Sequence, residues 1–343
     1  MSVLTPRPNE RHFFTACALT TGTARRRFAL FAWLILAYNL PVILWGAYVR
    51  ASFSGDGCGA NWPFCNGQLI PRNITGPTAI EYAHRMMTGL DSFAILLLCA
   101  WAFLSFPRRH AVRLYALLSL AFLLIEAMLG AGLVLFRYVA KNQSAARALY
   151  LSAHLTNTML LLGALTVTAW AAWSNCERIQ VRNFSGRAIH ALAIVLLVSI
   201  TGAVAALGDT LFPASSLTAG MRQDFSRAAS TMLRLRLLHP LIALLGAASL
   251  IAMTIRMLKQ KGAGHARRAA ALVLSITILQ LGAGLLNLGL LAPMWMQLIH
   301  LSIADVLWIA TMILALETSN PLRESGPDAG AESASLHQNQ KER

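Results

Sequence analysis

Four histidines in this sequence could bind a metal, because each lies near the same end of a long apolar segment. They are His84, His154, His239 and His300. A single histidine inside a membrane-spanning helix could be a satisfied hydrogen-bonding residue or part of a proton relay. Four at one depth, in two pairs, instead favour axial ligation of flat macrocycles held between helices. Zinc is disfavoured because neither pair has clustered cysteines or a third inward ligand. The pattern therefore predicts two haem sites.

Charged residues near two of these histidines make the pairs chemically unequal. Glu81 stands three positions before His84, and Arg236 stands three positions before His239. Residues three apart share a face of a helix, so each charge is expected to face the site of its histidine. An acid in an apolar pocket can handle protons, whereas a cation suits haem propionates. This predicts a working site in the N-terminal half and a redox or structural haem in the C-terminal half. The alternative for Glu81 is a solvated residue at the helix mouth, or one paired with Arg85.

A cysteine pair precedes the first of these histidines. Cys58 and Cys65 lie in the Gly- and Pro-containing stretch GDGCGANWPFCNGQLIP. On the outer side of a bacterial membrane, such thiols can be oxidised to a disulfide. The pair could pin the loop over the site as a structural bridge, or it could be redox-active and relay electrons.

The elements that position these residues are membrane-spanning helices. The chain has 343 residues, 56% of them hydrophobic and 13% charged, with apolar runs of about the length that crosses a bilayer core. The net charge is +15, and the basic residues that produce it lie mainly in short loops between these runs. Basic residues in such loops set the orientation of membrane spans, so nucleic acid is not an expected partner. The fold class is therefore all-α integral membrane. Eight spans are expected, at residues 28–50, 79–104, 111–136, 148–173, 187–208, 231–256, 269–291 and 294–316.

The distribution of basic residues predicts the orientation of these spans. With the N terminus in the cytoplasm, clusters such as Arg25-Arg26-Arg27 and Arg267-Arg268 lie inside. An even number of spans then returns the C terminus to the cytoplasm and places the four histidines toward the outer face. Residues 1–27 form a cytoplasmic segment without a cleavable signal, and the polar residues 318–343 form a disordered cytoplasmic tail.

The chain also repeats itself. LGAGLV at Leu129 returns as LGAGLL at Leu281, and GAYVR in the first span has a looser echo in GAVAALGD in the fifth. Residues 28–173 and 187–316 are therefore expected to be two tandem four-helix bundles with the same orientation. Close helix packing is the favoured role for the small residues of the repeated motif.

These motifs together resemble the haem A synthase family, over about residues 28–316. The resemblance rests on the loop cysteines around Trp62-Pro63, the run Glu81-Tyr82-Ala83-His84-Arg85, a histidine early in spans four, six and eight, and TGAVAALGDTLFP at the end of span five. One departure is Pro240, which follows His239 where arginine is expected. Proline removes a backbone donor, so the sixth span is expected to start or kink there, with Arg234 or Arg236 left to pair with a propionate.

The resemblance implies a membrane oxidoreductase that converts the methyl group at ring carbon eight of haem O to a formyl group, for cytochrome oxidase biogenesis. It implies that His84 and His154 face the substrate haem, that Glu81 assists the oxidation, and that His239 and His300 hold a haem b cofactor. Haem O synthase and the cytochrome oxidase assembly machinery are the implied partners, in the inner membrane of the cell. Membrane lipid and an unidentified electron donor are also expected to contact the chain. The sequence does not decide whether the chain forms a homo-oligomer.

Two questions stay open at this point. A bis-histidine haem has no free position for oxygen, so either His84 or His154 releases the iron, or the ring loses electrons and water supplies the oxygen. The alternative function is a bis-histidine dihaem cytochrome that passes electrons from quinol, and a transporter is a third hypothesis. Histidines at a single depth argue against electron transfer across the membrane.

Overall fold

The structure, a computed structural model, describes residues 22–179, 184–226, 231–260 and 264–319. Most of the two expected cytoplasmic ends, 1–27 and 318–343, lies outside the described residues. Within the described ranges the regular structure is helical, with one isolated bridge between Cys65 and Gln68. The helices are α1 Gly22–Ala51, α2 Gly76–Ser105, α3 Ala111–Leu135, α4 Ala145–Ser174, α5 Gly186–Leu211, α6 Leu217–Asp224, α7 Thr231–Arg236, α8 Leu238–Lys259, α9 Gly264–Gly289 and α10 Met294–Ser319.

Eight of the described helical segments are long and apolar enough to cross a membrane. Seven are single helices, and the sixth, Leu233–Lys259, takes in the end of α7 and all of α8. The prediction of an all-helical membrane protein with eight spans is confirmed. The short helix α6 was not expected, because its sequence carries no apolar run of its own. Helix α7 lies within the expected sixth span 231–256, but as a separate helix.

Capping residues explain why several helices begin before the apolar pattern does. The Thr75 side chain accepts a hydrogen bond from the Thr78 amide, with a proline in the first turn, so α2 starts three residues before the expected position 79. Ser144 caps α4 in the same way. Such caps satisfy backbone donors that the first turn of a helix leaves unpaired, and apolar periodicity does not register them.

The sixth span is interrupted just before its histidine. Pro240 has no amide hydrogen, so the carbonyl of Arg236 cannot accept the usual bond from four residues ahead. Helix α7 ends at Arg236 and α8 begins at Leu238, on either side of Leu237. The break therefore lies close to where the sequence predicts a start or a kink.

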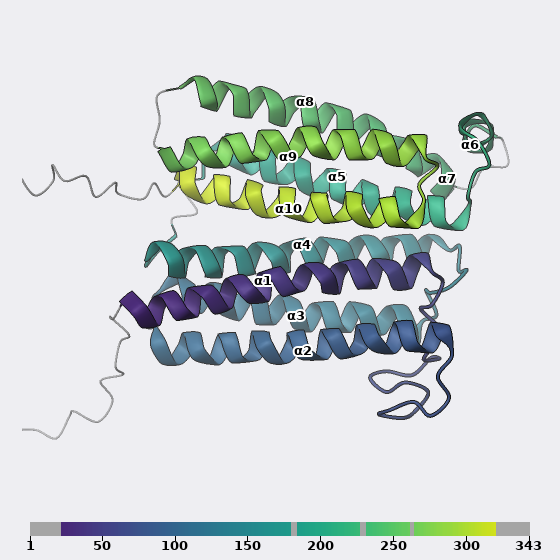
Figure 1. The fold of residues 1–343 in the computed structure, drawn as a ribbon, viewed down its shortest axis with the longest axis horizontal. Coiled ribbons are helices and arrows are strands. Elements are labelled where there is room, and N and C mark those ends of the chain that lie inside the picture. Colours follow the sequence, from purple (N-terminus) through teal and green to yellow (C-terminus); the bar gives the residue numbers. More distant parts are fainter. Residues whose placement is uncertain (1–21, 180–183, 227–230, 261–263, 320–343) are drawn as a thin grey trace, which may run out of the picture.

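The spans form a bundle whose two ends differ (Figure 1). Helices α1 to α4 lie together on one side, and α5 with α8, α9 and α10 lies on the other. Both ends of the described chain lie at the left of the view, while the loop after α1 and the short helices α6 and α7 lie at the right. Because α2, α4, α8 and α10 all begin at the right, their histidines share that end of the molecule.

Helix α4 joins the two sides of the bundle. It is the most buried of the eight spans, because 83% of the residues in its most apolar 18-residue stretch are buried inside the protein. The Trp308 indole of α10 donates to the Met159 carbonyl of α4 at 2.7 Å, and Trp170 of α4 donates to the Glu317 carboxylate of α10 at 2.8 Å. At the other end of the bundle, Arg50 of α1 donates to the Ala206 carbonyl of α5 at 2.9 Å. Polar contacts thus fix one side against the other near both ends.

Replacement of Trp308 by phenylalanine tests this junction. The change leaves the Met159 carbonyl without its buried indole donor, and we expect a loss of about 1 kcal/mol in the free energy of unfolding. Thermal unfolding in a mild detergent would show the loss as a lower Tm. The control is Trp295→Phe, at a residue that is 55% exposed. An equal Tm for the two variants would contradict the proposed role of the Trp308 hydrogen bond.

Candidate functional site

Each of the four histidines packs against a glycine on a neighbouring helix. A Cβ atom added to the glycine would lie 3.0 Å from Cε1 of the imidazole for Gly46 and His84, 3.9 Å for Gly130 and His154, 3.1 Å for Gly202 and His239, and 3.1 Å for Gly284 and His300. At three of the four positions this distance is too short for a side chain to fit without movement of its neighbour. Three of the glycines therefore make room for an imidazole, whereas Gly130 lies at ordinary contact distance from His154. All four belong to the motifs that repeat between the two halves.

The histidines of the C-terminal half face each other at a distance that suits a metal between them. The ring centroids of His239 and His300 are 6.4 Å apart, and the rings are inclined at 79°. With metal–nitrogen bonds of about 2 Å, two imidazoles on opposite sides of one metal have centroids about 6 Å apart. These two residues therefore fit a bis-histidine haem.

Neutral side chains accompany this pair. The Thr201 hydroxyl lies 3.2 Å from Nδ1 of His239, which leaves Nε2 for another partner. The Gln280 amide nitrogen lies 3.3 Å from Nε2 of His300. Nδ1 of His300 is buried, and no described residue pairs with it. Hydrogen bonds of the kind that Thr201 makes fix the orientation of a ligating imidazole.

The histidines of the N-terminal half have a carboxylate beside them. His84 and His154 interact electrostatically with each other and with Glu126 of α3. Nδ1 of His154 lies 3.2 Å from Oε1 of Glu126, at an ion-pair distance. Nδ1 of His84 is buried without a partner in the described part of the chain. Buried polar atoms are rarely left unpaired, so this histidine pair is also suited to an additional ligand.

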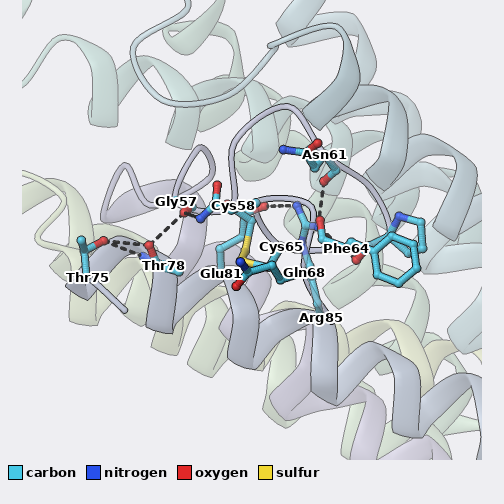
Figure 2. Close-up of a disulfide and its surroundings, with 12 residues drawn as sticks. Gly57, Cys58, Asn61, Phe64, Cys65, Gln68, Thr75, Thr78, Glu81 and Arg85 are labelled. Carbon is cyan, nitrogen blue, oxygen red and sulfur yellow. Dashed lines mark hydrogen bonds and ion pairs between the residues drawn. A yellow bond between two sulfur atoms is a disulfide. The ribbon is translucent and has the colours of Figure 1, made fainter. Parts of the chain in front are cut away.

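The structure gives Glu81 a definite set of partners (Figure 2). Its carboxylate accepts hydrogen bonds from the Cys58 amide at 2.8 Å and from the Arg85 guanidinium at 2.5 Å, and the residue is 4% exposed. Arg85 in turn donates to the carbonyls of Asn61 and Phe64, both at 2.8 Å. Glu81 thus fastens the loop to the first turns of α2, as the alternative interpretation of a pair with Arg85 anticipated. Its part in the chemistry stays a prediction.

Cys58 and Cys65 form a disulfide, and both side chains are buried. The Thr78 hydroxyl donates to the Gly57 carbonyl at 2.9 Å and adds a second link between this loop and α2. The bridge therefore closes a loop that lies directly on the helix of His84, at the end of the bundle that holds all four histidines.

Arg236 lies among acceptors from two other helices. Its guanidinium is 2.7 Å from the Asp224 carboxylate of α6 and 3.4 Å from the Asp209 carboxylate of α5. It also donates to the Phe212 carbonyl at 3.2 Å. The side chain is 9% exposed. Arg236 thus ties the segment before His239 to α5 and α6, and the predicted contact with a haem propionate stays a prediction.

Several acidic residues inside the spans, Asp91 and Glu317 among them, were missed by sequence reasoning, and two others stand out. Glu126 contacts His154, and Asp305 of α10 is fully buried with neither oxygen paired in the described residues. Both lie in otherwise apolar stretches of their helices, which is itself a signal of function because ionisable groups are costly in a membrane. Neither stands within one helical turn of a histidine in the sequence, so the spacing that singles out Glu81 and Arg236 does not reveal them.

Replacement of Glu81 by alanine tests its hold on the disulfide loop. The variant loses the acceptor for the Cys58 amide and for Arg85, so we expect the Cys58–Cys65 bridge to react several-fold faster with a membrane-impermeant phosphine. Alkylation of the released thiols followed by mass analysis measures the rate. Arg72→Ala, at an exposed side chain of the same loop, serves as control. Equal rates in the wild type and Glu81→Ala would show that Glu81 does not hold the loop.

The chain matches one protein family over residues 29–312, and that family is described as cytochrome oxidase assembly protein. A "Protoheme IX farnesyltransferase" of Thermus thermophilus is 40% identical over 291 residues, which cover 84% of this chain and 48% of that protein. The chain thus spans about half the length of this relative.

Proteins named "Heme A synthase" are also similar to parts of the chain. That of Exiguobacterium sibiricum is 33% identical over 179 residues, 52% of this chain and 59% of that protein. That of Lysinibacillus sphaericus is 43% identical over 97 residues, 28% of this chain and 32% of that protein.

Proposed function

We propose that this chain, which belongs to the cytochrome oxidase assembly protein family, acts in haem A synthesis and oxidises the ring carbon-eight methyl group of haem O to a formyl group. The observation that carries the proposal is the arrangement of two histidine pairs at one end of the bundle, each histidine set against a glycine. Similarity to proteins named "Heme A synthase" supports the substrate class.

We assign different tasks to the two halves. Residues 28–173 form the substrate haem bundle, and residues 187–316 form the haem b bundle. The assignment is supported by the neutral hydrogen-bonding partners of His239 and His300 and by the carboxylates near the other pair. A haem b held by His239 and His300 would supply electron transfer. The chain's contribution there is to orient both imidazoles, through Thr201 and through the space left by the glycines.

The reaction sets clear demands on the substrate site. Conversion of a methyl group to a formyl group is a four-electron oxidation. If water supplies the oxygen atom, four protons are released and four electrons must pass to an acceptor; if O2 supplies it, O2 is itself the oxidant and is reduced to the formyl oxygen and one water. His84 and His154 would bind the iron of haem O and hold its ring in place. The disulfide loop, fastened by Glu81 and Arg85, would cover the mouth of the site and limit access of water. Glu81 would accept protons as the methyl group is oxidised.

Orientation and partners follow from the same proposal. The disulfide favours the outer, oxidising side for the end that holds the histidines, and both termini would then lie in the cytoplasm of a bacterial cell with the chain in its inner membrane. The substrate must come from an enzyme that farnesylates haem, and the Thermus relative, about twice as long as the matched region, carries the name of such an enzyme. We infer that a haem O synthase hands its product to this chain, and that cytochrome oxidase assembly receives haem A from it.

A dihaem cytochrome is the second candidate, because the spacing of His239 and His300 suits a permanently bound haem whether or not the other pair turns over substrate. It differs in one measurable respect. A cytochrome holds two haems that are chemically unaltered, whereas the synthase holds one and modifies the other.

Expression in a bacterial host that makes haem O but has no haem A synthase of its own tests the proposed reaction. We expect haem A, or its hydroxylated precursor, in extracted haems analysed by mass spectrometry. The His84→Ala variant should lose most of this product, because it removes a ligand of the substrate. His265→Ala, at an exposed residue near the start of α9, should retain it. Unmodified haem in cells with well-expressed wild-type protein would contradict the proposed reaction.

A further inference from the structure

We propose that Glu126 is a positioning residue of the N-terminal histidine pair, which holds His154 with Nδ1 toward α3 and leaves Nε2 for the substrate haem. The inference rests on the proposed function only in that it takes His84 and His154 as the residues that face a haem. It concerns binding and orientation of the haem, and it does not depend on which oxidation follows.

The position of Glu126 is fixed by three contacts with α4. Its Oε1 atom lies 3.2 Å from Nδ1 of His154. Its Oε2 atom accepts a hydrogen bond from the Asn157 amide at 2.6 Å, and the Thr158 hydroxyl donates to Oε1. Asn157 and Thr158 stand about one turn after the histidine. The carboxylate is therefore held against the same stretch of α4 that carries His154.

The placement of a carboxylate here has a cost that packing alone does not explain. Glu126 is the one acidic residue in α3, whose 25 residues are otherwise strongly apolar. The side chain is 20% exposed, and that of His154 is 27% exposed. An ionisable group inside a membrane span is retained when it serves a site, and the nearest group that a metal could use is the imidazole.

A hydrogen-bond acceptor at Nδ1 decides which nitrogen of a neutral histidine carries the proton. When Nδ1–H faces the carboxylate, Nε2 presents its lone pair, which is the form that ligates a metal. The contact in this structure is close without being an aligned hydrogen bond, since Nδ1 of His154 has no partner that meets hydrogen-bond geometry in the described residues.

In the described part of the second half, neither His239 nor His300 has a carboxylate partner. In the repeat that aligns Leu129 with Leu281, the position of Glu126 corresponds to Ile278. The histidines there have a threonine hydroxyl and a glutamine amide as partners. The carboxylate partner is thus a feature of the proposed substrate site. The two histidine pairs therefore also differ in the side chains that contact their imidazoles.

Titration of purified protein with haem O tests the inference. The protein is made in a host that supplies haem b but no haem O, and binding of haem O in detergent is followed by absorbance. Loss of a partner behind a metal ligand weakens binding by about ten-fold or more. We therefore expect Glu126→Leu to raise the Kd for haem O about ten-fold and to change the EPR spectrum of the bound ferric haem, with haem b content unchanged. Glu126→Gln retains an acceptor oxygen and should restore part of the affinity.

Glu317→Leu is the matched control, because Glu317 is also a buried carboxylate in a span but lies at the opposite end of the bundle. It should leave the Kd for haem O unchanged. An unchanged Kd and EPR spectrum in Glu126→Leu would overturn the inference, as would equal losses of haem O and haem b, which indicate a packing role. If the Glu126 variants lose affinity while the wild type makes no haem A, the inference stands and the proposed reaction fails. A wild type that binds no haem O overturns both.

Discussion

The structure depends on a constraint of the bilayer, which offers no water to polar groups inside a helix bundle. Every buried imidazole, carboxylate or guanidinium must find its partner within the protein or in a bound ligand. Several charged side chains among the described residues meet the demand internally. Glu81 pairs with Arg85 and a loop amide, and Arg236 lies between two aspartates. The imidazoles of the two histidine pairs are only partly hydrogen-bonded within the protein. Nitrogen atoms of His84 and His300 are buried and have no partner among the described residues.

Each of the two pairs contains a histidine with such a buried nitrogen. Glycines from neighbouring helices leave space for the imidazoles of His84, His239 and His300, so the backbone itself reserves room at one end of the bundle. The sites then differ in what stands behind the ligands. One pair has neutral partners, and the other has Glu126 within the bundle and a disulfide loop held by Glu81 above it. A retained redox haem in one half and an exchangeable substrate in the other is consistent with that difference.

The sequence predicted the spans and singled out the four histidines and the cysteine pair as candidates, because apolar runs and isolated polar residues are local signals. It could not predict the partners of those residues, since these come from distant helices. Arg236 stands three residues before a histidine, yet its carboxylate partners lie in α5 and α6. Glu126 of α3 contacts His154 of α4, and the glycines of the repeat proved to accommodate imidazole or tyrosine rings in addition to packing helices. Helix boundaries differed where caps, which carry no apolar signal, extended the first turn.

The central claim is that the two histidine pairs are different haem sites, one permanent and one exchangeable. The most direct measurement is the haem content per chain of protein purified from a host without haem O, for the wild type, a His84→Ala/His154→Ala double variant and His239→Ala. Our account predicts one haem b per chain in the wild type, the same in the double variant, and a loss of that haem in His239→Ala. Two haem b per chain in the wild type, with one removed by either change, would contradict it.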